Sequence, residues 1–77
     1  MITVRYFAAA EEAAGRPEES REERTLDALR AAVVADHPAL GAILPRCSVL
    51  VDGSRHDADV SLAQVRTIDI LPPFAGG

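Results

Sequence analysis

One segment in the middle of the chain, residues 25 to 36, predicts a single amphipathic helix that the rest of the chain must cover. Leu26, Leu29 and Val33 recur at helical spacing and define one apolar stripe. Thr25 has the side chain of a good N-cap for this helix. Because 77 residues suffice for only one domain, the stripe has to be buried against short elements on either side of it.

The segment before this helix predicts a strand, a short helix and one element of undecided structure. Residues 1 to 7 alternate between apolar and polar positions, with Phe7 as the apolar exception on the polar face. Residues 8 to 15 are rich in alanine and predict about two helical turns that stop at Gly15. Residues 16 to 24 are almost wholly charged, and they fit either a solvated edge strand or a mobile connection.

The segment after the helix predicts a hairpin and a final strand. Residues 47 to 51 are apolar and β-branched, and Asp52-Gly53 is a strong hairpin signal, because both turn positions need a positive φ. Residues 54 to 60 fit a return strand or a loop. Residues 66 to 71 predict the last strand, which directs Ile68 and Ile70 inward and Asp69 and Leu71 outward.

The order of these elements favours one fold class. Strand, short helix, strand, main helix and three further strands indicate an α+β roll of the ubiquitin-like, β-grasp kind. We therefore expect residues 1–77 to form a single domain, a small mixed sheet with one main helix packed across it. Residues 72–77 are expected to extend from it as a flexible C-terminal tail ending in Gly-Gly.

Composition and charge exclude several classes of function. The net charge of -4 disfavours nucleic-acid binding and favours a protein partner with a basic groove. The chain has no lysine and a single cysteine, Cys47, so an internal disulfide or a cysteine-based zinc cluster is impossible. The spacing of His56, Asp52, Asp57 and Asp59 matches no known metal site, so no metal is expected. No signal peptide or membrane span is visible, and we expect a cytoplasmic protein.

The residues after Leu71 have the properties of a probe that enters the active site of another protein. Pro72 and Pro73 fix φ and favour an extended backbone that leaves the sheet stiffly. Gly76 and Gly77 lack a Cβ, so that their backbone can thread a channel too narrow for any side chain.

The carboxylate of Gly77 is the expected reactive group. A free carboxylate is a poor electrophile, but ATP converts it into an acyl-adenylate with a good leaving group. A sulfide or persulfide donor that attacks the adenylate leaves a C-terminal thiocarboxylate, whose sulfur is nucleophilic. Because no nucleophile–base pair or phosphate loop is present, we expect activation and transfer to be catalysed by partner proteins.

Three stretches resemble the ubiquitin-like sulfur carriers, the family that includes the small subunit of molybdopterin synthase and the thiamine sulfur carrier. Residues 4–15 resemble the opening strand and helix, and residues 25–29 resemble the start of the main helix. Residues 49–53 together with 71–77 resemble the closing hairpin and the tail. Two positions depart from the family pattern. Gln64-Val65-Arg66 stands where many members have Asp-Gly-Asp, and Arg55 stands where an apolar residue is common.

The resemblance implies a non-catalytic carrier with three kinds of partner. These are an E1-like adenylating enzyme that uses ATP, a persulfide protein that donates sulfur, and a large catalytic synthase subunit that accepts the tail. No cofactor is expected to bind the chain itself. The residues expected to contact partners are Phe7, Leu71, Pro72, Pro73, Phe74 and Ala75, of which Phe7, Leu71 and Phe74 form an exposed apolar patch.

Other functions fit the same tail. One is sulfur delivery to another product, such as thiamine, cysteine or a secondary metabolite. A second is a protein modifier that forms isopeptide bonds through Gly77. A third is an interaction module whose tail is inert. The sequence does not separate these alternatives, because the chemistry at Gly77 is common to the first two.

Overall fold

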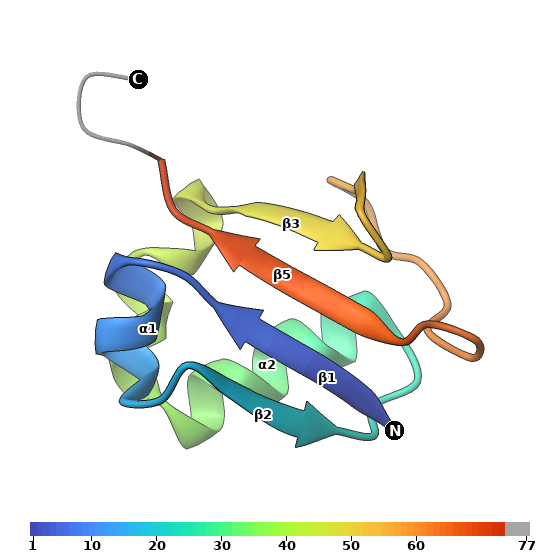
Figure 1. The fold of residues 1–77 in the computed structure, drawn as a ribbon, viewed down its shortest axis with the longest axis horizontal. Helices are drawn as coiled ribbons and strands as arrows, with labels where there is room; N and C mark the ends of the chain where they lie inside the picture. Colours follow the sequence, from blue (N-terminus) through green and yellow to red (C-terminus); the bar gives the residue numbers. More distant parts are fainter. Residues whose placement is uncertain (74–77) are drawn as a thin grey trace.

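The computed structural model describes residues 1–73, which form one five-stranded mixed sheet with helices on one face (Figure 1). The sheet order is β2-β1-β5-β3-β4. The strand bounds are β1 Ile2–Tyr6, β2 Glu18–Arg21, β3 Ser48–Val51, β4 Ser54–Arg55 and β5 Thr67–Leu71.

The first and last strands lie side by side in the middle of the sheet. β1 and β5 are parallel, with Val4 opposite Ile68 and Tyr6 opposite Ile70. The other neighbouring pairs, β1 with β2, β5 with β3 and β3 with β4, are antiparallel. The carboxyl ends of β1 and β5 therefore point to the same edge of the domain, where α1 also lies (Figure 1).

The helices have the caps that the sequence predicts. α1 spans Ala9–Ala14 and ends at Gly15, whose φ of 73° is the left-handed conformation typical of a glycine C-cap. α2 spans Leu26–Asp36, and the Thr25 hydroxyl accepts the backbone N–H of Ala28 at 3.2 Å. Two short 3-10 helices follow, η1 at Pro38–Ala42 and η2 at Leu44–Arg46.

The core lies between the sheet and α2, with α1 and the 3-10 helices at one end. The predicted stripe of Leu26, Leu29 and Val33 has no exposed surface. It packs under the inward side chains of the sheet, which come from alternate strand positions. These are Ile2, Val4, Tyr6, Val49, Val51, Ile68 and Ile70.

The structure decides the two alternatives that the sequence leaves open. The charged segment forms an edge strand, because β2 pairs with β1 from Arg5–Glu18 to Ile2–Arg21. The return arm of the Asp52-Gly53 hairpin is a strand only at Ser54–Arg55 and a loop thereafter. Asp52 and Gly53 both have positive φ, 48° and 87°, as the turn requires.

No helix within residues 1–73 is long and apolar enough to span a lipid bilayer. This finding agrees with the sequence, in which every apolar run is short.

Candidate functional site

The face of the sheet opposite the helices, which we call the open face, carries the side chains that alternate with the core. Near the carboxyl ends of β1 and β5 these side chains are Phe7 and Leu71. Phe7 is 40% exposed, although it is large and apolar, and Leu71 is half-buried. The Phe7 backbone N–H donates to the Ile70 carbonyl at 3.2 Å, so Phe7 continues the pairing of β1 with β5. The predicted neighbours Phe7 and Leu71 thus stand together at the edge from which the tail leaves.

The chain turns sharply immediately after Phe7. Ala8 has φ 50° and ψ -123°, a conformation that glycine adopts easily and alanine rarely. The turn is closed by the Ala10 N–H, which donates to the Phe7 carbonyl at 3.0 Å. The buried Ala10 of α1 then returns to the core. The turn therefore ends the backbone pairing with β5 at Phe7, one residue after β1, and keeps that ring at the margin of the open face.

Pro72 and Pro73 have different surroundings. Pro72 is buried and continues the inward alternation of Ile68 and Ile70, whereas Pro73 is exposed. The exposed part of the chain after β5 therefore begins at Pro73. The remaining predicted site residues, Phe74, Ala75, Gly76 and Gly77, lie outside the described residues.

A charged pair occupies the middle of the open face. The Arg5 guanidinium donates from Nε to Asp69 Oδ1 at 2.5 Å and from Nη2 to Oδ2 at 2.9 Å. The hydrogen bond to Asp69 raises the pKa of Arg5 above its ordinary value. The Asp69 side chain is only 12% exposed, while that of Arg5 is 46% exposed. Both Asp69 oxygens are thus already paired, and the guanidinium remains partly accessible to a partner.

A comparison of the chain with models of known protein families finds a match. The model of the ThiS family matches residues 4–77, which is nearly the whole chain. The chain belongs to the ThiS family.

Three solved structures share the fold. SAMP1 from Haloferax volcanii superposes with a TM-score of 0.79 at 23% identity and covers 99% of this chain and 98% of its own. The small archaeal modifier protein 1 from Methanosarcina acetivorans gives 0.76 at 23% identity, with 99% and 95% covered. A candidate molybdopterin converting factor, subunit 1, from Pyrococcus furiosus gives 0.72 at 20% identity, with 95% and 97% covered. No curated protein is significantly similar to the chain in sequence. These neighbours confirm the predicted β-grasp fold.

A second polar cluster in this ThiS-family domain corrects one expectation. The sequence predicts either a solvated edge strand or a mobile connection for residues 16 to 24, but within this strand Glu19 points toward the helix layer. Its carboxylate accepts the Tyr6 hydroxyl at 2.5 Å and lies 2.7 Å from His37 Nε2. Burial raises the pKa of Glu19, but the hydrogen bonds from Tyr6 and His37 outweigh burial, and the pKa lies below its ordinary value. The physical reason is strand alternation in β2, which turns every second side chain inward.

The surroundings of Cys47 disfavour a reactive thiol. Cys47 is half-buried, its Sγ lies 3.3 Å from the Ile43 carbonyl, and burial raises the pKa of its thiol, which disfavours the reactive thiolate. Among the described residues, no group of three His, Cys, Asp or Glu side chains is placed to hold a metal ion.

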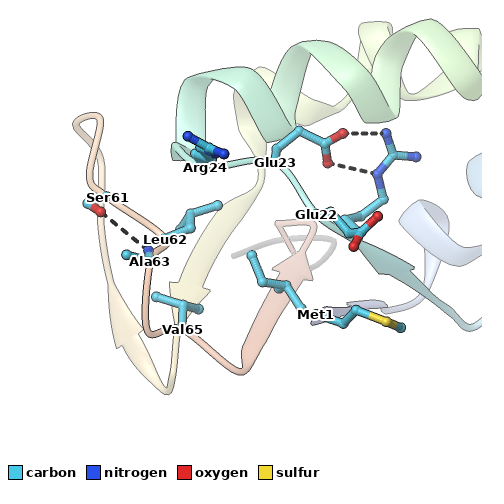
Figure 2. A pocket seen from close by; sticks show the side chains of 10 residues that line it. Met1, Glu22, Glu23, Arg24, Ser61, Leu62, Ala63 and Val65 are labelled. Atoms are coloured by element: carbon cyan, nitrogen blue, oxygen red, sulfur yellow. Dashed lines mark hydrogen bonds and ion pairs between the residues drawn. The ribbon is translucent and has the colours of Figure 1, made fainter.

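A hollow of about 520 Å³ opens at the other end of the sheet, beside Met1 (Figure 2). The carboxylate of Glu23 accepts two hydrogen bonds from Arg21 there, both at 2.9 Å, so these charges are already paired. Ser61 accepts the Ala63 N–H at 3.3 Å across the hollow's rim. The hollow lies beside the amino end of β1, whereas Phe7 and Leu71 lie at the carboxyl ends of β1 and β5.

Proposed function

We propose that this ThiS-family chain is a sulfur carrier that is loaded at the Gly77 carboxylate and most closely fits the small subunit of molybdopterin synthase. The observation that carries the proposal is the family match along residues 4–77, which includes the Gly-Gly end. Its surface supports the proposal, since the apolar pair of Phe7 and Leu71 lies where β5 gives way to the tail. A partner that takes the tail would cover this pair at the same time.

The proposed loading uses two steps, both catalysed by partners. The Gly77 carboxylate attacks the α-phosphorus of ATP, and pyrophosphate leaves as the acyl-adenylate forms. Sulfide then attacks the acyl carbon, and AMP leaves with the C–O bond that breaks. If the donor is a protein persulfide, the product is an acyl disulfide, and a thiolate cleaves its S–S bond to release the thiocarboxylate and a new disulfide. The chain supplies only the carboxylate and the docking surface, so we propose that it is not itself an enzyme.

The sulfur is proposed to pass to a pterin precursor held by a large catalytic subunit. The structural similarity to the Pyrococcus furiosus protein supports this destination, because that protein is described as a subunit of a molybdopterin converting factor. Delivery to thiamine, cysteine or another product remains the alternative for the same loaded tail.

A second candidate function is protein modification through Gly77. It is favoured by two of the structural neighbours, which are named as small archaeal modifiers. The chemistry begins with the same adenylate, and the outcome differs only in whether sulfur or a protein amine attacks the acyl carbon. Since the chain has no lysine, its own side chains offer no amine as an acceptor.

One experiment separates these functions. The full chain is incubated with its host's adenylating enzyme, ATP and a sulfur donor, and its intact mass is measured. Replacement of one terminal oxygen by sulfur supports the carrier, whereas stable conjugates to other proteins support the modifier. Neither product, with the enzyme active on a control substrate, contradicts both.

Two further samples sharpen that experiment. A variant that lacks Gly77 should keep the fold and lose loading, and a loaded form of this variant would contradict the mechanism. Loaded wild-type chain is then used to capture its acceptor from host extract. A pterin-binding large subunit supports the molybdopterin assignment, and an acceptor of another pathway redirects it.

A further inference from the structure

The open face carries one row of side chains that crosses all five strands. The backbone register places Arg5 opposite Glu18 on β2 and opposite Asp69 on β5. It also places Leu50 of β3 opposite Asp69 on one side and opposite Arg55 of β4 on the other. Residues opposite each other in a sheet share a face, so these five side chains lie in line.

The charges in this row are not equivalent. Arg5 and Asp69 neutralise each other in the centre, with two hydrogen bonds. Glu18 at the β2 edge is exposed and has no ion pair within 4.0 Å among residues 1–73. Arg55 at the β4 edge pairs only loosely with Asp57, at 3.3 Å, and the two side chains are 65% and 82% exposed. Such an exposed ion pair contributes little to the stability of the fold, and Arg55 can readily exchange Asp57 for an acidic group of a partner.

The row therefore has a direction. A negative group stands at one edge and a positive group at the other, about 19 Å apart if four strand spacings separate them. Between them lie a neutral ion pair and Leu50, and the apolar pair of Phe7 and Leu71 lies one row nearer the tail. A surface of this kind can be docked in only one orientation without placing like charges against each other.

We infer that Glu18 and Arg55 orient the chain on the enzyme that activates Gly77, which should present a basic group to Glu18 and an acidic group to Arg55. The inference rests on the proposed function, because it requires an enzyme that receives the tail. Continuity of the surface supports a partner that takes the tail, and the adenylating enzyme is the partner that the carrier and the modifier functions share. The charged row lies directly beside Phe7 and Leu71, and an enzyme that holds the residues after Pro73 must cover that edge.

Charge-reversal variants test the inference. Glu18→Arg and Arg55→Glu are made singly and together, and kcat/KM for adenylation of the full chain is measured with pyrophosphate exchange. The double variant has the wild-type net charge but the reverse direction of charge along the row. Glu22→Arg and Arg24→Glu, also single and double, are the controls, because both residues are exposed and lie in the connection from β2 to α2. Thermal unfolding confirms that every variant is folded.

The expected result is a loss of about tenfold for each single variant on the row and roughly a hundredfold for the double variant. The controls should change by less than about twofold. The losses should shrink at about 1 M salt, where charges are screened beyond roughly 3 Å. A double variant that regains wild-type kcat/KM would show that only net charge matters, and it would overturn the inference.

The failure of the inference and that of the proposed function are distinguishable. If wild-type chain is loaded and the row variants behave like the controls, the orienting role is wrong and the carrier function stands. If wild-type chain is never adenylated, the proposed function is wrong, and the inference is overturned with it.

Discussion

The two faces of the sheet are built from the same strands, but one packs into the core and the other is partly exposed. On the buried face the inward positions of β1, β3 and β5 are apolar, and Val4, Ile68 and Ile70 have no exposed surface. On the open face the adjacent positions hold an exposed Phe7, a half-buried Leu71 and the Arg5–Asp69 pair. The difference indicates that stability is supplied mainly by one face. The other face is free to carry residues that suit a partner rather than the fold.

The largest expected effect comes from neighbouring residues of β5 that point to opposite faces. Ile70→Ala should lower the free energy of unfolding by about 2–5 kcal/mol, because it leaves a cavity in the core. Leu71→Ala should cost about 1 kcal/mol or less, because Leu71 is only partly buried and, within residues 1–73, no second layer packs over it. Denaturant unfolding of both variants measures the difference, and equal losses would break the distinction between the faces.

The next effect is a loss of docking with little change in the stability of the fold. Phe7→Asp should lower kcat/KM for adenylation roughly a hundredfold, about 2.8 kcal/mol, because it places a charge where an aromatic anchor is expected to be covered. The free energy of unfolding should change by about 0.5 kcal/mol or less. Ala31→Asp is the matched control, since it adds the same charge to the exposed side of α2. A comparable loss in this control would contradict a docking role for the open face.

A smaller effect on the free energy of unfolding is expected from pH, through the carboxylate of Glu19 that is turned toward the core. The folded-state pKa of Glu19 lies below its ordinary value, so the stability that its charge contributes is present above the unfolded pKa and is lost as the pH falls through the folded pKa. Glu19→Gln should cost on the order of 1 kcal/mol at neutral pH, since it removes a hydrogen-bonded charge shared by Tyr6 and His37. Unfolding between neutral and acidic pH should show a flatter acid limb for this variant. If the loss of stability at acidic pH is the same in this variant as in the wild type, Glu19 does not contribute to the pH dependence of stability.

The smallest effect is expected at the centre of the open face. Arg5→Leu leaves Asp69 largely buried without its partner, whereas Arg5→Leu with Asp69→Ala removes both charges together. The double variant should therefore unfold at a temperature closer to that of the wild type than the single variant does. Thermal unfolding of the set measures this. A double variant less stable than Arg5→Leu would mean that Asp69 stabilises the fold independently of Arg5.

The sequence predicts the fold well because its local signals agree with one another. The Leu26, Leu29 and Val33 stripe, the Thr25 cap and the Asp52-Gly53 turn each predict an element that the structure contains. Local periodicity and turn chemistry decide these elements, and neither depends on distant residues.

The pairing of distant side chains is what the sequence does not reveal. Arg5 and Asp69 are both predicted on the outer face, but their bidentate contact depends on the parallel register of the first and last strands. The inward direction of Glu19 likewise depends on β2 being a paired strand rather than a connection. The burial of Pro72 can be predicted from the sequence, because Pro72 follows Ile70 by two residues and so extends the inward alternation of Ile68 and Ile70.

The segment of residues 64–66 leads from a turn at Ala63–Gln64 into β5, and one side chain ties the end of this segment to the hairpin. Asp52 Oδ1 accepts the backbone N–H groups of Arg66 and Thr67, at 3.0 and 2.9 Å. The hydrogen bond from Thr67, and after it the one from Arg66, lowers the pKa of Asp52 below its ordinary value. A carboxylate of the hairpin thus holds the start of β5, a contact between residues far apart in the sequence.

The footprint of the adenylating enzyme on the chain tests the docking role of the open face most directly. Backbone amide signals of the isotopically labelled full chain are recorded by NMR with increasing amounts of the enzyme. If the open face docks on the enzyme, the signals of Phe7, Asp69 and Leu71 should broaden or shift first, while those of Ala31 and Ala35 on the exposed side of α2 stay in place. A footprint centred on α2, with the open face unchanged, would contradict this docking role.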